Sequence, residues 1–223
     1  MTSEEFAAYV AKIRAYETAD RSAWDNRVLL LADNKDLNAG DFAADSNLLA
    51  GLVPGGYEFI KAYYLAPLTK AQTRSALLTA LQNGVGLFNY VGHGGPGSLA
   101  GENLLTSADV ATLNNGPRLP LMSAATCTVG NYGIPGYRTL SMLITLLGDG
   151  GASAVFAPTG ESYDADAVPL MKKLFENLYA AGTRRVGDAT LPALAQYSAA
   201  NGALYAVRSY NLQGDPAALL PWR

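Results

Sequence analysis

The chain has 223 residues, of which 49% are hydrophobic and 16% are charged, and its formal net charge is −3. This composition can bury a substantial core, so it excludes a disordered chain and predicts a single domain. The weak negative charge and the absence of a Lys/Arg-rich run argue against a nucleic-acid-binding protein. No apolar run approaches the roughly 20 residues that span a bilayer, and we expect no signal peptide within this sequence.

Helices and strands are predicted in alternation along the chain. Apolar residues at helical spacing predict a leading helix over residues 4–19, with Ser3 as its cap. The other predicted helices are 42–53, a helix capped by Thr69 and ended at Gly84, 138–147, 168–181 and 188–200. Apolar runs predict strands at 27–32, 57–64, 87–91, from 121 onward and at 152–157, whereas 210–216 is predicted as a terminal turn region. This alternation predicts a mostly parallel sheet covered by helices on both faces.

The only histidine, His93, and the only cysteine, Cys127, each follow one of these apolar runs. Because open α/β sheets bind ligands at the carboxyl ends of their strands, both residues are expected at a site. A thiol is a useful nucleophile only as thiolate, and imidazole can accept its proton near neutral pH. The placement indicates a Cys–His dyad. The alternative is a small buried cysteine and a hydrogen-bonded structural histidine.

A single cysteine excludes an intrachain disulfide and a zinc site built on several thiolates. The glycines on both sides of His93 allow the backbone to approach a substrate closely, and the amide of Gly94 could donate to a developing oxyanion. The alternative is that residues 94–97 form a tight turn and nothing more.

Several motifs together resemble the gingipain-type cysteine peptidases, which are peptidase family C25 of the caspase-like clan CD. They are Asn89–Gly94, Leu104–Thr106 with Asp109–Val110, Leu119–Pro120, Ala125–Cys127 and the closing Leu212–Pro216. The resemblance implies a caspase-like three-layer α/β/α sandwich with a mostly parallel sheet. It also implies one catalytic domain over residues 1–223, either a compact variant or a part excised from a larger precursor.

The resemblance implies a cysteine endopeptidase that works through an acyl-enzyme. Cys127 would be the nucleophile, His93 the general acid and base, and the amides of Gly94 and Cys127 the oxyanion hole. The family places an acidic residue that orients the imidazole in the loop after the first strand, where this chain offers Asp33, Asn34 and Asp36. We expect Asp33 in this role, although it could instead turn the chain by hydrogen bonding to nearby amides.

Narrow specificity for Arg or Lys before the scissile bond is also implied. Tyr163, Glu161, Ser162 and Thr126 are expected to line the substrate pocket. Asp41 is the nearest counterpart of the carboxylate that holds an arginine side chain in the family, and it could equally be a helix cap. The loop after His93 departs from the family because it carries no tryptophan.

No cofactor is required by this chemistry. Some members of the family bind calcium through acidic loops, and the candidate ligands in this chain are Asp33, Asp36, Asp41 and Asp45. The expected partners are a peptide or protein substrate and a prosegment or flanking domains, and the expected location is secreted or at the cell surface. Two other functions stay open: a transpeptidase with the same dyad, and a non-catalytic binding module with the same fold.

Overall fold

The computed structural model describes residues 1–21, 24–201 and 204–222. In this part of the chain six strands form the central sheet, in the order β2-β1-β3-β7-β8-β9. Their bounds are β1 (Arg27–Ala32), β2 (Glu58–Tyr63), β3 (Leu87–Val91), β7 (Leu121–Ala125), β8 (Ala154–Pro158) and β9 (Tyr210–Gly214). Only β9 runs antiparallel to its neighbour, so the predicted mostly parallel sheet is confirmed.

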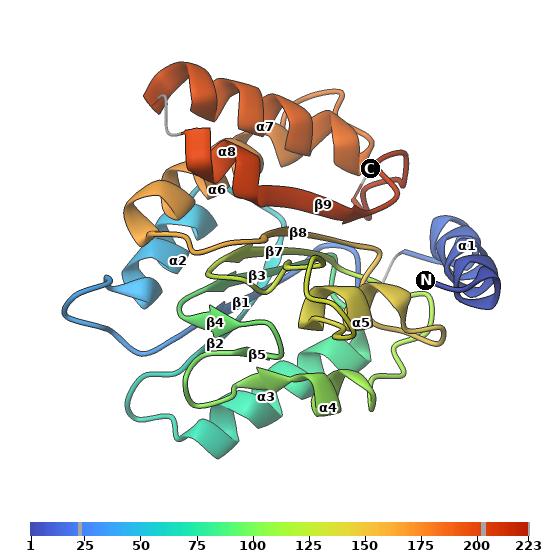
Figure 1. Ribbon diagram of the computed structural model, residues 1–223, viewed down its shortest axis with the longest axis horizontal. Coiled ribbons are helices and arrows are strands. Elements are labelled where there is room, and N and C mark those ends of the chain that lie inside the picture. The colour runs from blue at the N-terminus through green and yellow to red at the C-terminus, as the bar shows by residue number, and fades with distance from the viewer. Residues whose placement is uncertain (22–23, 202–203, 223) are drawn as a thin grey trace.

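Helices cover both faces of this sheet, which gives the predicted three-layer α/β/α sandwich (Figure 1). One face packs against α2 (Phe42–Ala50), α6 (Asp164–Leu178), α7 (Val186–Asn201) and α8 (Leu204–Ser209). The other face packs against α3 (Lys70–Asn83), α4 (Ser107–Val110) and α5 (Leu140–Leu146). The leading helix α1 (Ser3–Thr18) lies beside α5.

Strand β1 shows why the sequence reads as continuous apolar runs. Val28 and Leu30 belong to the core under α2 and α6, whereas Leu29 and Leu31 belong to the core over α3. Side chains alternate between the two faces of a strand, and here both faces are dry, so every position must be apolar.

The strand order places a topological switch point between β1 and β3. From β1 the chain moves outward to β2 and then returns to β3 on the opposite side of β1. The segments that follow β1 and β3 therefore leave the sheet in different directions and open a crevice at its carboxyl edge, which is where sheets of this class bind ligands.

Several predicted boundaries need correction. Thr2 rather than Ser3 caps α1, with the reciprocal bond from Glu5 that completes a capping box. Thr69 caps α3 as predicted, and Gly84 has a positive φ of 84° at its end. Helix α6 begins at Asp164, four residues before the predicted start.

The predicted terminal turn region is wrong over residues 210–214, which form β9 against β8. Helix α8 and a small three-stranded sheet were not predicted. That sheet consists of β4 (Gly94–Gly95), β5 (Ser98–Leu99) and β6 (Leu105–Thr106). Among the described residues no helix is both long and apolar enough to cross a bilayer.

Truncation of Leu30 to alanine tests the two-faced core. Leu30 is fully buried, so Leu30→Ala should lower the free energy of unfolding by about 2–5 kcal/mol, through lost burial and the cavity left behind. Leu191→Ala is the matched control, because Leu191 is 70% exposed and its truncation should change stability by less than about 0.5 kcal/mol. Chemical denaturation measures both, and equal effects would contradict the assignment of the core.

Candidate active site

A cleft of about 790 Å³ lies at the carboxyl edge of the sheet. The segments that follow β1, β3, β7 and β8 contribute its walls, and His93, Gly94 and Cys127 all line it. The structure therefore brings together the histidine and the cysteine that the sequence singled out. Both come from neighbouring strands, since β3 pairs with β7.

A tight turn after β7 presents Cys127. Thr128 has a positive φ of 44°, an uncommon conformation for a β-branched residue, and the amide of Val129 donates to the carbonyl of Cys127 at 2.5 Å. The amide of Thr128 donates to Gly160 at 2.9 Å, which ties the turn to the segment after β8. Strained backbone of this kind is concentrated at functional sites.

The sulfur of Cys127 is half-buried and free of any disulfide. It contacts only the backbone of Ser162 among the described residues: the Ser162 amide donates to Sγ at 3.4 Å, and Sγ lies 3.3 Å from the Ser162 carbonyl oxygen. In the same part of the chain, the Cys127 amide has no hydrogen-bond acceptor. Both the thiol and this amide are thus available on the cleft side of the turn.

The imidazole of His93 is held by a carboxylate and an aromatic ring. Its Nε2 lies 3.0 Å from Oδ2 of Asp36, and the ring of Phe42 meets it edge-on at 5.3 Å between centroids. Nδ1 has no hydrogen-bond partner among the described residues. This leaves one ring nitrogen free for proton transfer while the other is oriented.

Asp36, not Asp33, is therefore the acidic partner of the imidazole, which corrects the prediction. Asp33 is only 1% exposed, and its carboxylate accepts the backbone amides of His93 at 3.2 Å and Asn34 at 2.8 Å. Burial raises the pKa of Asp33, against the opposing effect of these two amides. Asp33 shapes the backbone of the histidine loop, which is the chain-turning role left open by the sequence.

Asp36 sits in a short loop closed by a bridge to Gly40. The amide of Asn38 donates to its carboxylate at 2.7 Å. This amide and the imidazole of His93 lower the pKa of Asp36, so the carboxylate is ionised throughout the neutral range. The sequence offers Asp36 for this role beside Asp33 and Asn34, but the turn that aims Asp36 at His93 has no sequence signal of its own, so the prediction falls on Asp33.

Gly94 lies against the segment of Cys127. A Cβ at this position would be 2.3 Å from Oγ1 of Thr126 and 3.0 Å from a methyl group of Val129. Gly94 pairs with Leu99 and Gly95 with Ser98, so residues 94–97 do form part of a hairpin turn, and the absence of a side chain lets this hairpin approach β7. The Thr126 hydroxyl is buried and has no hydrogen-bond partner within the residues that the structure describes.

The cleft is acidic: Asp36, Glu161, Asp164 and Asp166 line it, and no Lys or Arg of the described ranges does. Asp36 is bound to His93, and the hydroxyl groups of Tyr197 and Tyr205 bind the two oxygens of Asp166. Glu161 and Asp164 have no cationic partner among the described residues. The two carboxyl groups remain available to a positively charged ligand.

Asp164 is paired with a second carboxyl group. A Cβ on Gly40 would lie 2.8 Å from Oδ2 of Asp164 and 3.7 Å from Oδ2 of Asp45, so the two carboxyl groups converge beneath this glycine. Burial and the neighbouring Asp45 raise the pKa of Asp164 to about 6. The pair therefore holds a proton in mildly acidic solution.

Of the residues predicted to bind substrate, four line the cleft and one lies outside it. Tyr163, Glu161, Ser162 and Thr126 line the cleft, and the exposed ring of Tyr163 packs edge-on against Tyr205 at 6.3 Å. Asp41 does not line it: its carboxylate caps α2 through the amide of Ala44 and pairs with Lys35 at 3.1 Å. Asp41 is the helix cap that the sequence left as its alternative role.

The four candidate calcium ligands are engaged separately. Asp33 binds amides, Asp36 binds His93, Asp41 binds Lys35 and Asp45 adjoins Asp164. The described residues contain no group of three or more His, Cys, Asp or Glu that could hold a metal ion. The geometry lends no support to calcium binding by this stretch.

Known structures share this fold. The Arg-specific cysteine proteinase gingipain R (RgpB) matches with a TM-score of 0.84 at 21% identity, over 99% of this chain and 54% of that one. The complex of Porphyromonas gingivalis RgpB pro- and mature domains matches with a TM-score of 0.84 at 20% identity, over 99% and 55%. The Saccharomyces cerevisiae separase–securin complex matches with a TM-score of 0.61 at 16% identity, over 94% and 13%.

The fold is thus the caspase-like α/β fold of the gingipain structures, and the chain spans about half the length of the gingipain R chain that it matches. Comparison with curated proteins gives no match. A family model described as peptidase family C25 matches residues 1–221. The match covers nearly every residue, and the protein therefore belongs to peptidase family C25.

Proposed function

We propose that this protein is a cysteine endopeptidase whose nucleophile is Cys127 and whose general acid and base is His93. The observation that carries the proposal is that the only cysteine and the only histidine of the chain line one cleft at the carboxyl ends of adjacent strands. The strained turn of Cys127, its unengaged amide and the Asp36–His93 contact support the same function.

In the proposed reaction, the Cys127 thiolate attacks the scissile carbonyl carbon, and the carbonyl electron pair moves onto oxygen. The amides of Gly94 and Cys127 donate to this oxyanion, and such donors are typically worth about 3 kcal/mol each. His93 then gives its proton to the leaving amine as the C–N bond breaks. The same imidazole takes a proton from water, whose oxygen attacks the acyl-enzyme and releases the thiolate.

Asp36 is proposed to orient the imidazole and to stabilise its charged form during proton transfer. The contact is partly exposed, so water screens it and its contribution should be modest. Family membership and the RgpB pro-domain complex support a prosegment partner and export of the enzyme, which are parts of this proposal.

We further propose that the residue before the scissile bond is Arg or Lys. The support is the acidic lining of the cleft, in which Glu161 and the Asp164–Asp45 pair have no cationic partner among the described residues. A guanidinium group can bind such carboxylates through two parallel hydrogen bonds.

The test of the whole proposal is a peptide library in which the residue before the scissile bond varies. We expect cleavage after Arg or Lys, and Cys127→Ala should lower kcat by about 10⁴-fold or more because no other thiol is present. Mass spectrometry with an added amine distinguishes hydrolysis from transpeptidation through the amide-linked product. Cleavage that survives in Cys127→Ala would remove this residue from the mechanism. If the wild type neither hydrolyses peptides nor transfers an acyl group to the amine, the peptidase proposal fails and the non-catalytic binding module remains.

Two substitutions distinguish the role of Asp36 from that of Asp33. Asp36→Asn should lower kcat roughly tenfold with little change in KM, since it weakens an exposed contact to the imidazole but leaves the pocket intact. Asp33→Asn is the comparison variant: it should mainly lower the thermal midpoint, because Asp33 holds backbone amides. A larger kcat loss in Asp33→Asn at unchanged stability would reverse the assignment.

The third prediction concerns pH and the charge of the pocket. Asp164 is neutral below its pKa of about 6 and ionised above it, so affinity for a cationic side chain should rise as pH increases from 5 to 7. The quantity to measure is the ratio of kcat/KM for paired Arg and citrulline substrates, because any effect of pH on the shared chemical steps cancels in this ratio. Asp164→Asn should flatten this ratio against pH and lower it by about tenfold or more.

Asp41→Asn is the matched control, since asparagine also caps helices and Asp41 lies outside the cleft. Its pH profile should keep the shape of the wild-type profile with at most a small shift, because Asp41 acts on Asp164 only through Asp45. A wild-type ratio that is independent of pH, or a profile unchanged by Asp164→Asn, would remove Asp164 from substrate selection.

A further inference from the structure

The hairpin segment that carries Gly94 has little stability of its own. Strands β4, β5 and β6 contain two residues each, which is shorter than strands that persist without outside support. Two non-glycine residues in the connection, Ala100 and Asn103, have positive φ values of 63° and 59°. Asparagine tolerates this conformation but alanine rarely adopts it, so Ala100 indicates that surrounding contacts hold the segment in place.

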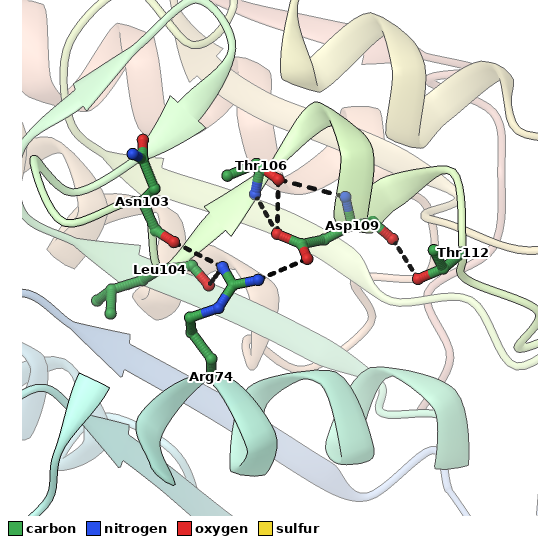
Figure 2. A network of polar contacts seen from close by, with 6 residues as sticks. All are labelled: Arg74, Asn103, Leu104, Thr106, Asp109 and Thr112. Atoms are coloured by element: carbon green, nitrogen blue, oxygen red, sulfur yellow. Dashed lines mark hydrogen bonds and ion pairs between the residues drawn. The ribbon is translucent and has the colours of Figure 1, made fainter. Parts of the chain in front are cut away.

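In addition to the burial of the side chains of Leu99, Leu104 and Leu105, Arg74 of α3 supplies polar contacts to this segment (Figure 2). Its Nη1 donates to the carbonyl oxygens of Asn103 at 2.6 Å and Leu104 at 3.0 Å, and its Nη2 donates to Oδ1 of Asp109 at 2.6 Å. The Arg74 and Asp109 side chains are only 26% and 14% exposed, so the pair is less screened than an ion pair on the open surface. These three hydrogen bonds of the guanidinium all go to residues 103–109, which follow β5.

Asp109 connects Arg74 to the end of β6. Its second oxygen, Oδ2, accepts the amide of Thr106 at 2.8 Å and the hydroxyl of Thr106 at 2.7 Å. Although burial opposes ionisation, the hydrogen bonds from Arg74 and Thr106 hold the pKa of Asp109 below its ordinary value. The carboxylate is therefore charged at all neutral pH values and joins Arg74 to the strand.

A short series of backbone bonds connects this pair to the candidate active site. The amide of Leu104 donates to Leu99 at 2.8 Å, and Leu99 pairs with Gly94 across β4 and β5. The amide of Ala100 donates to the carbonyl of His93 at 2.7 Å. The backbone that Arg74 binds is thus hydrogen bonded to Leu99, and Leu99 is the strand partner of Gly94.

We propose that Arg74 and Asp109 form a positioning clamp that fixes the Gly94 amide, and the backbone of His93, relative to Cys127. This inference rests on the proposed peptidase function for its consequence, and neither residue touches the reacting atoms. An oxyanion donor must lie within hydrogen-bond distance of the oxygen as charge develops, so a displacement of about 1 Å can reduce the rate about 100-fold. The clamp prevents that displacement.

The test compares Arg74→Met with Arg27→Met. Both remove an ion-paired arginine of similar exposure, since the side chain of Arg27 is 29% exposed and that of Arg74 is 26% exposed. Arg27 pairs with Glu58 at the amino ends of β1 and β2, away from the cleft. Methionine keeps an unbranched apolar stem and a similar helix propensity at position 74 of α3. We expect Arg74→Met to lower kcat by about 10- to 100-fold with KM changed less than twofold, whereas Arg27→Met stays at the wild-type value.

Two further readouts distinguish positioning from general stability. The rate at which iodoacetamide alkylates Cys127 should fall much less than kcat in Arg74→Met, because alkylation depends on the imidazole but uses no oxyanion hole. Arg74→Lys should recover only part of kcat, since one ammonium cannot span two carbonyls and a carboxylate as a guanidinium does. Arg74→Met, Asp109→Asn and the double variant should give nonadditive losses, because both act through one pair.

Hydrogen exchange measures the clamp without any assay of activity. The amides of Ala100 and Leu104 should exchange at least tenfold faster in Arg74→Met than in Arg27→Met, while the amide of Leu121 in β7 stays unchanged as an internal reference. Unchanged exchange at both positions, or an unchanged kcat in an active enzyme, would overturn the clamp. If the wild type cleaves no peptide, the peptidase proposal fails and the exchange result alone decides the clamp.

Discussion

The parallel register of β1, β3 and β7 is the constraint on which the candidate site depends. Ala32 pairs with Val91, and Val91 pairs with Ala125, so the three strands end on one line across the sheet. The ladder continues one step further, because the amide of Asp33 donates to Val91 and the amide of Gly92 donates to Ala125. The loops that bear Asp36, His93 and Cys127 consequently start side by side, although 91 residues separate Asp36 from Cys127 along the chain.

The surroundings, not the residue type, decide what each carboxyl group does. Asp33 is buried at the end of β1 and accepts backbone amides, while Asp36, three residues later and partly exposed, reaches the imidazole. Burial and a neighbouring acid raise the pKa of Asp164, whereas a guanidinium beside Asp109 helps to lower the pKa of that carboxyl group. Four chemically identical side chains therefore perform structural, orienting, substrate-selecting and clamping roles in our proposals.

Much of the architecture could be predicted because its signal is local. The runs at 27–32 and 87–91 are apolar except for Arg27 and Asn89, as expected of buried parallel strands, and the end of the second run located His93 correctly. The choice between Asp33 and Asp36 failed because a turn of three residues, fixed by the Asn38 amide, sets which carboxylate reaches the ring. Strand β9 was missed for a different reason: Leu212–Gly214 has no clear alternation, and its pairing with β8 is a long-range contact.

The distance between neighbouring strands explains how two separate loops could form one oxyanion hole. Parallel strands lie about 4.8 Å apart, so donors that leave adjacent strands can both reach one oxygen at about 2.9 Å. For Gly94 and Cys127 this requires that nothing stands between the two segments, and Gly94 meets that requirement because any Cβ would overlap Thr126. The sheet fixes the spacing, the glycine permits the approach, and the strained hairpin must then be held from outside, which is the physical reason that a residue as distant as Arg74 matters to the site.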